Sequence, residues 1–159
     1  MPSTSLSAGV LLVRARSGDL EYFLVHPGGP FFRKKDAGVW GIPKGLVAEG
    51  EDPFDTARRE LVEETGFAIP EGPFVAIGEV TQRSGKRVLG WAVAGDADPK
   101  ALVSNTFDMI WPPRSGRSQS FPEVDRGDWF GRDAAALKMN PAQLPFLDRA
   151  AERRAELGL

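Results

Sequence analysis

The stretch Gly45–Phe67, "GLVAEGEDPFDTARRELVEETGF", gathers many acidic side chains around one pair of arginines. Asp52 followed by Pro53 is typical of a helix N-cap with proline at the first helical position. Gly66 stands where a left-handed C-terminal cap is expected. We therefore predict a helix over residues 53–65. Like charges one turn apart weaken such a helix, so the crowded glutamates call for a specific role.

Helical spacing places the glutamates relative to the buried face. At about 100° per residue, one narrow stripe forms the predicted buried face, consisting of Phe54, Ala57, Leu61 and Thr65. Glu60 and Glu64 lie together at the edge of this stripe. Glu63 lies further round, where Arg59 can pair with it. Clustered carboxylate oxygens suit Mg²⁺ or Mn²⁺ better than a softer transition metal. The alternative is a solvated helix face whose arginines balance the glutamates.

The composition is that of an ordinary globular chain. Its 159 residues are enough for a buried core, and we expect a single domain over residues 1–159. The net charge is −2, from 20 basic and 22 acidic residues, which gives no general case for a nucleic-acid coat or a membrane-surface protein. The absence of cysteine excludes disulfides and thiolate nucleophiles. The N-terminal apolar run is too short for a secretory core or a membrane span, so we expect a cytoplasmic protein.

Strand and turn patterns surround the predicted helix. Apolar runs separated by turn residues predict strands over residues 7–15, 20–26, 74–82 and 86–95. A loop rich in Gly and Pro connects the second run to the helix region. Residues 104–125 predict a strand, a basic loop and another short strand, and residues 141–159 have helical spacing. Strands flanking one central helix, with a second helix last, indicate a mixed α/β sandwich.

The residues from Gly45 onward match a known pattern in full. Gly45, five residues, Glu51, seven residues and then "RELVEETGF" reproduce the Nudix box, G-x5-E-x7-R-E-U-x-E-E-x-G-U, where U is a bulky apolar residue. The chain therefore resembles the Nudix hydrolase superfamily. The resemblance implies an α/β/α sandwich with a mixed β-sheet, a loop-helix-loop formed by the box at residues 45–67, and a C-terminal helix. It also implies metal-dependent hydrolysis of a nucleoside diphosphate linked to another group.

The family's metal ligands carry over onto positions of this box. Glu60 and Glu64 resemble the main ligands for Mg²⁺ or Mn²⁺, and Glu63 resembles a residue that assists directly or through water. The Gly45 carbonyl resembles a backbone ligand. A divalent cation neutralises phosphate charge and lowers the pKa of bound water, which suits hydrolysis at neutral pH.

Other charged residues are candidates for orienting the site and for moving a proton. Arg59 resembles the residue that orients the glutamates by ion pairing, and Glu51 resembles the box glutamate that fixes the loop. In several Nudix branches a glutamate outside the box acts as general base. Glu123, which follows the basic loop "PPRSGRSQS", is the candidate here. Its alternative is an ordinary carboxylate at a strand edge.

Basic residues before the box are candidate phosphate contacts. Lys44 ends the segment "WGIPKG" and adjoins the predicted metal-binding loop. Arg33, Lys34 and Lys35 in "FFRKK" supply further positive charge, and the alternative for each is an ordinary exposed loop cation. Together they fit a highly anionic substrate.

The residues of the box do not specify the substrate. "WGIPKG" resembles the segment found in hydrolases of diadenosine polyphosphates and diphosphoinositol polyphosphates. The tyrosine often found downstream of the box in the dinucleoside-polyphosphate branch is missing, because "TQRSGKR" stands there. We predict a nucleoside or dinucleoside polyphosphate, with a diphosphoinositol polyphosphate or the 5′ end of an RNA as alternatives. A non-catalytic nucleotide-sensing Nudix module is the alternative of another class. The resemblance also implies a possible homodimer.

Overall fold

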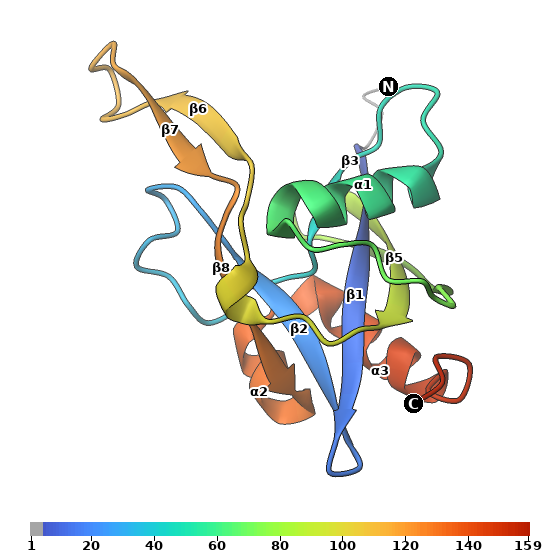
Figure 1. Cartoon of the computed structure of the whole chain (residues 1–159). Coiled ribbons are helices and arrows are strands. Elements are labelled where there is room, and N and C mark those ends of the chain that lie inside the picture. The colour runs from blue at the N-terminus through green and yellow to red at the C-terminus, as the bar shows by residue number, and fades with distance from the viewer. Residues whose placement is uncertain (1–4) are drawn as a thin grey trace.

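The computed structural model describes residues 5–159, so residues 1–4 of the predicted single domain lie outside the described residues. Figure 1 shows the arrangement of the elements. The strands are β1 (Leu6–Arg16), β2 (Asp19–Pro27), β3 (Lys44–Leu46), β4 (Val75–Thr81), β5 (Arg87–Ala94), β6 (Thr106–Ile110), β7 (Ser118–Pro122) and β8 (Val124–Gly131). The α-helices are α1 (Pro53–Thr65), α2 (Arg132–Lys138) and α3 (Leu144–Glu152), with 3₁₀ turns at Pro99–Ala101 and Pro141–Gln143.

The main sheet is mixed, as predicted. Its strand order is β4-β5-β1-β2-β8, with the short strand β3 pairing off this path with β1. β1 runs parallel to β5 and antiparallel to β2, which follows it in a hairpin. The central position of β1 explains its continuous apolar run, because a strand with neighbours on both edges and layers on both faces is buried along most of its length, here residues 7–13.

Helices cover both faces of the sheet. Along β1 successive side chains point to opposite faces. Val10 and Leu12 therefore pack in the cluster that contains Leu61 of α1, whereas Leu11 packs in the cluster that contains Phe146 of α3. Each fully buried aliphatic side chain contributes about 1.5–3 kcal/mol. The chain thus forms the predicted α/β/α sandwich. Within residues 5–159, the helices are too short or too polar to cross a bilayer.

The helix of the box forms where its caps predict. The Asp52 side chain accepts a hydrogen bond from the backbone N–H of Asp55 at 3.2 Å. Gly66 has φ 72° and donates its N–H to the Val62 carbonyl at 2.7 Å. A residue with a side chain would be strained in this left-handed conformation, so glycine lets the chain turn sharply after α1.

One member of the predicted buried stripe is placed differently. Ala57, Leu61 and Thr65 are buried, but Phe54 is only half-buried and Thr56 is buried in the same helix. Phe54 lies in the first turn of α1, where its ring meets the Phe74 ring edge-on at 5.2 Å between centroids. The start of the helix therefore packs against the chain before β4 and also against β5 of the sheet, where the Phe54 and Trp91 ring centroids are 5.3 Å apart.

The sequence patterns missed or misplaced four elements. The edge strand β8 was not predicted as a strand of its own, because only one short strand was expected after the basic loop. The three-residue strand β3 lies in the region predicted as loop, where it pairs with β1. Helix α2 was not predicted, since its seven residues are short and its N-cap Gly131 provides no side-chain hydrogen bond. The helix predicted over residues 141–159 is α-helical only at Leu144–Glu152. Its first residues form a 3₁₀ turn capped by Asn140. Pro145 has no N–H to donate to the Pro141 carbonyl, so the first α-helical hydrogen bond of this segment cannot form.

Strands β6 and β7 form a separate two-stranded sheet, which we call the finger (residues 106–122). It projects from the body of the molecule beside the loop that follows β2 (Figure 1). Phe107 and Phe121 face each other across the two strands, and Trp111 at the finger's turn meets Phe31 of the loop edge-on at 5.5 Å. These aromatic contacts anchor the finger, because an isolated hairpin is marginally stable in water.

Candidate active site

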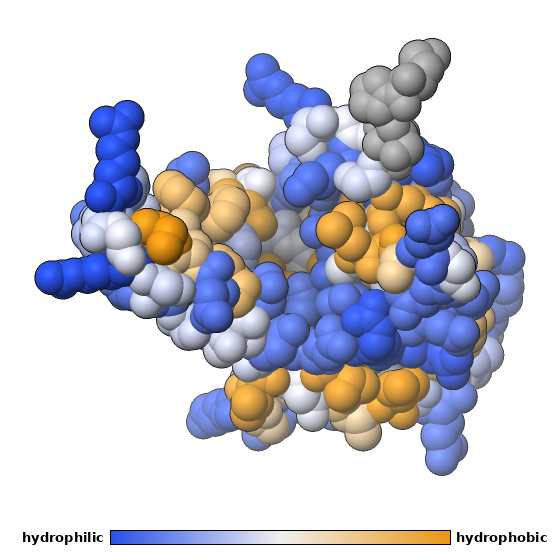
Figure 2. Space-filling model, turned by 90° about the horizontal axis from the view of Figure 1, so that it is seen from above, coloured by the Kyte–Doolittle hydropathy of each residue, from blue (hydrophilic) through white to orange (hydrophobic). Residues whose placement is uncertain are grey.

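A cavity of about 460 Å³ brings together charged side chains from four parts of the chain. Glu64 comes from α1, Glu123 from the junction of β7 and β8, Lys44 from β3, and Lys86 from the turn between β4 and β5. The Phe32 ring adds an aromatic wall. Viewed from above, the surface is hollowed between the finger and the body of the molecule (Figure 2). Carboxylates and ammonium groups in one cavity suit a ligand bound through both cations and anionic groups.

Glu64 has the most perturbed electrostatic environment of the site. Burial raises the pKa of Glu64 to about 8, and the negative charges of Glu60 and Glu123 add to the increase. The backbone N–H of Lys44 opposes this increase by donating to Glu64 Oε2 at 3.0 Å. The same contact fixes the carboxylate against β3. A desolvated carboxylate beside other carboxylates has a strong tendency to bind either a proton or a metal cation.

Arg59 holds the outer glutamates in a network. Its guanidinium donates to both carboxylate oxygens of Glu51, at 3.0 and 3.1 Å. It also reaches Glu60 at 3.0 Å and Glu63 at 3.1 Å. These hydrogen bonds lower the pKa of Glu51 to about 2 and raise the pKa of Arg59. Because the network is partly exposed, it contributes little to stability. Its main effect is to link the loop before α1 to the glutamates of α1.

Gly45 is placed where no side chain fits. A Cβ atom at this position would lie 2.0 Å from the Glu60 carboxylate carbon and 2.2–2.4 Å from its oxygens. The first glycine of the box therefore lets the backbone of β3 approach the Glu60 carboxylate directly. The Gly45 backbone and the Glu60 carboxylate, two of the metal ligands that the resemblance implies, therefore lie side by side.

The donor set fits a hard divalent cation. In residues 5–159, no three acidic or histidine side chains are gathered closely enough to hold a metal in their present arrangement. The pKa of Glu60 is nevertheless raised, as that of Glu64 is, because Glu60 is partly buried and the negative charge of Glu63 lies nearby. Buried carboxylates that repel one another are the oxygen ligands that Mg²⁺ and Mn²⁺ prefer.

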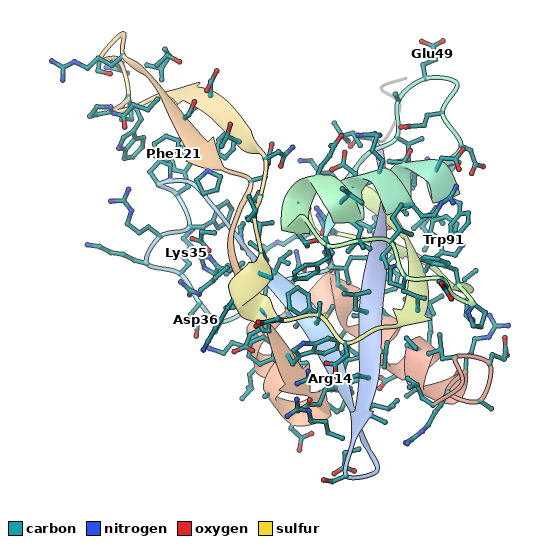
Figure 3. The ribbon with its side chains drawn as sticks, viewed as in Figure 1. Arg14, Lys35, Asp36, Glu49, Trp91 and Phe121 are labelled. Atoms are coloured by element: carbon teal, nitrogen blue, oxygen red, sulfur yellow. The ribbon has the colours of Figure 1, made fainter. Side chains whose placement is uncertain are left out.

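The structure separates the predicted phosphate contacts into two groups. Lys44 lines the cavity, and burial among its neighbours lowers the pKa of its ammonium group. Arg33, Lys34 and Lys35 are exposed on the loop after β2 and do not line the cavity. Figure 3 shows Lys35 on that loop, on the side of the finger and away from α1. The Lys35 carbonyl instead accepts a hydrogen bond from His26, at 2.7 Å from Nε2.

Sequence reasoning missed four residues of the cavity wall. Lys86 and Gln82 come from the turn between β4 and β5, and Asn140 and Gln143 come from the segment between α2 and α3. None belongs to the box, and no local pattern marks these polar residues as more than turn residues and caps. Only the packing of α3 against β4 brings the two segments to the same cavity.

A family model described as "NUDIX domain" matches residues 4–150 of the chain. The chain belongs to the NUDIX family. The match covers the box, the cavity residues and all three helices, except for the end of α3.

Curated NUDIX relatives match part of the chain. A protein named RNA pyrophosphohydrolase from Rhizobium meliloti is 30% identical over 105 residues, which cover 57% of this chain and 58% of that protein. Another of the same name, from Bartonella henselae, is 32% identical over 92 residues, which cover 53% of each chain. The chain thus spans little more than half the length of these curated relatives.

Solved NUDIX structures share the fold over nearly the whole chain. The NUDIX domain of Shewanella oneidensis NrtR, complexed with ADP ribose, has a TM-score of 0.66 and 18% identity, covering 97% of this chain and 90% of that chain. An Ap4A hydrolase from C. elegans has a TM-score of 0.64 and 19% identity, covering 94% of this chain and 98% of that chain. At these identities the likeness establishes the fold.

Proposed function

We propose that this NUDIX chain is a metal-dependent pyrophosphohydrolase that cleaves a pyrophosphate bond in a nucleoside diphosphate linked to another group. The preferred substrate is a nucleoside or dinucleoside polyphosphate. The observation that carries the proposal is the cavity that joins the buried carboxylate of Glu64 to the ammonium group of Lys44. Acidic residues for a cation and basic residues for phosphates in one cavity are what hydrolysis of a phosphoanhydride requires.

The glutamates of α1 would hold the metal. Glu60 and Glu64, with Glu63 and the Gly45 carbonyl, supply the oxygen donors for Mg²⁺ or Mn²⁺. A bound cation neutralises phosphate charge and lowers the pKa of a bound water, which supplies a nucleophile near neutral pH. Arg59 orients the carboxylates through its contacts with Glu60 and Glu63.

Residues outside the helix would bind the substrate and move a proton. The Lys44 backbone fixes Glu64, and its ammonium group contacts a phosphate from the same cavity wall. Glu123 is the proposed general base. Its backbone is fixed on both sides, since its N–H donates to the Asn105 carbonyl and its carbonyl accepts from Gly28, both at 2.9 Å. Arg33 and Lys35 remain predicted as outer contacts for a long anionic substrate.

The 5′ end of an RNA is the second candidate substrate. The relatives named RNA pyrophosphohydrolase suggest it, and the finger provides an observation of its own. Arg114 and Arg117 are exposed at its turn, close in sequence to Trp111, whose ring meets that of Phe31. Exposed cations beside aromatic rings are typical of surfaces that bind single-stranded nucleic acid. Arg114→Gln with Arg117→Gln should then weaken turnover of a 5′-triphosphorylated oligonucleotide and leave a nucleoside triphosphate unaffected.

A substrate panel tests the proposal. Release of phosphate or pyrophosphate is measured with Mg²⁺ and with Mn²⁺ on nucleoside triphosphates, dinucleoside polyphosphates, ADP-ribose, diphosphoinositol polyphosphate and triphosphorylated RNA. We expect turnover by the wild type and loss of at least about 100-fold in Glu64→Gln. Glu71→Gln, an exposed glutamate outside the cavity, is the matched control. Binding without any turnover would favour a nucleotide sensor, and full activity of Glu64→Gln would contradict the metal assignment.

Three further properties stay predictions. A single domain over residues 1–159, a cytoplasmic location and a homodimer each follow from sequence patterns or from the resemblance. Light scattering of the purified chain tests the dimer directly.

A further inference from the structure

The wall of the cavity formed by the β4–β5 turn and the chain before α3 contains a relay of amide groups. Gln143 is only 2% exposed and its Oε1 accepts the backbone N–H of Ile42 at 3.0 Å. A backbone N–H can only donate, so this contact fixes which end of the Gln143 amide is oxygen. Gln143 Nε2 must then point the other way, where it donates to Gln82 Oε1 at 3.0 Å.

The relay determines what Gln82 offers to the cavity. Because its oxygen already accepts from Gln143, the remaining group of the Gln82 amide is its NH₂ donor. Asn140 repeats this arrangement. Its Oδ1 accepts the backbone N–H of Ala142 at 3.0 Å, which leaves its NH₂ group as the donor. Both residues line the cavity, so two oriented amide donors stand on this wall.

Two lysines complete the wall. Lys44 and Lys86 both line the cavity, Lys44 from β3 and Lys86 from the turn between β4 and β5. Among the salt bridges of residues 5–159, none includes Lys44 or Lys86. Two cations beside two amide donors provide positive charge and hydrogen-bond donors on the same wall of the cavity. Such a set is complementary to phosphate oxygens.

We propose that Lys86, Gln82 and Asn140 form a second phosphate-binding subsite, which selects substrates with a phosphoryl group beyond the pyrophosphate held at the glutamates. Gln143 is the positioning residue of this subsite, because its amide is held by the Ile42 N–H and orients Gln82. The inference rests on the proposed function, since it divides one substrate between the glutamates and this wall. The ligand class is a linear chain of three or more phosphoryl groups.

Several compounds share that chemistry. A nucleoside triphosphate, a dinucleoside tetraphosphate and a 5′-triphosphorylated oligonucleotide each present a further phosphate, whereas ADP-ribose presents only two. Steady-state kinetics on these four compounds therefore shows which of them use the subsite. The variants are Lys86→Gln, in an exposed turn, and Asn140→Asp, which keeps the acceptor for the Ala142 N–H but removes the amide donor.

We expect Lys86→Gln to lower kcat/KM for the polyphosphate substrates by about 10- to 100-fold, mainly through KM, since a charged hydrogen bond to the substrate is lost. Asn140→Asp should lower it at least as much, because it adds a negative charge. The value of kcat/KM for ADP-ribose should stay unchanged in Lys86→Gln. Lys86→Arg should recover most of the lost kcat/KM on the polyphosphate substrates. Lys100→Gln, an exposed lysine outside the cavity, is the matched control. An equal loss on all compounds, or no loss, would overturn the subsite.

A binding measurement keeps this inference separate from the catalytic proposal. Inorganic tripolyphosphate and pyrophosphate are titrated calorimetrically into the metal-free wild type and Lys86→Gln. The wild type should bind tripolyphosphate more tightly than pyrophosphate, and the variant should lose that preference. If no compound is hydrolysed but this preference is present, the catalytic proposal fails and the subsite stands. If compounds are hydrolysed and the preference is absent, the subsite fails alone.

Discussion

Replacing Glu64 with glutamine should stabilise the metal-free protein at alkaline pH while abolishing its activity. The pKa of Glu64 rises from 4.5 to about 8 on folding, so the folded protein holds this proton more tightly than the unfolded chain does. The contribution of the Glu64 carboxyl to stability is therefore most favourable below pH 4.5 and is lost as the pH rises to about 8. Glutamine carries no charge, and it can keep the hydrogen bond from the Lys44 N–H.

The structure sets the size of the effect. At about 1.4 kcal/mol per pKa unit, the rise from 4.5 to about 8 corresponds to a ceiling of about 5 kcal/mol. Access of water through the cavity reduces this value, and we expect about 2–3 kcal/mol between wild type and Glu64→Gln at pH 9. At pH 5 the difference in the free energy of unfolding should nearly vanish.

Urea denaturation of both proteins from pH 5 to pH 9 in the presence of EDTA measures the difference. Glu71→Gln, which removes an exposed glutamate, corrects for the loss of one surface charge. Added Mg²⁺ or Mn²⁺ should restore the stability of the wild type at pH 9 and leave Glu64→Gln unchanged, because a ligand stabilises the state that binds it. Parallel pH profiles for wild type and Glu64→Gln would refute the burial argument for Glu64.

Three further predictions concern the packing around the box. Gly45→Ala should fold, as thermal unfolding will show, but lose most metal-dependent activity, because its methyl group would collide with the Glu60 carboxylate. Leu61→Ala should lower the free energy of unfolding by about 2–5 kcal/mol in urea, since Leu61 is fully buried. The pKa of Glu51 is lowered to about 2, so its pairing is present above pH 4.5 and is lost as the pH falls to 2. Acid titrations of stability for wild type and Glu51→Gln should therefore converge at low pH; a constant difference would contradict this pairing.

The helix of the box could be predicted because its determinants are local. Asp52, Pro53 and Gly66 act on the backbone within one turn, and the spacing of Glu60 and Glu64 follows from the helix itself. The pairing of Arg59 with Glu63 follows from the same spacing. Helix α2 could not be predicted because its start has no capping side chain. Its formation depends on burial of residues such as Ala135 in the cluster that contains Phe146.

The sequence by itself determined the family, the position of the helix and the spacing of the glutamates along it. It could not determine which basic residues reach the cavity. Lys35 and Lys44 are both candidate phosphate contacts in sequence, with Lys44 favoured because it adjoins the box. Of the two, Lys44 lines the cavity, because β3 pairs with β1 and carries it inward. Gln82 and Gln143 meet only through the packing of distant segments. Contacts between residues far apart in the chain depend on how the sheet and helices pack. The tertiary structure alone therefore decided the cavity wall formed by the β4–β5 turn and the chain before α3.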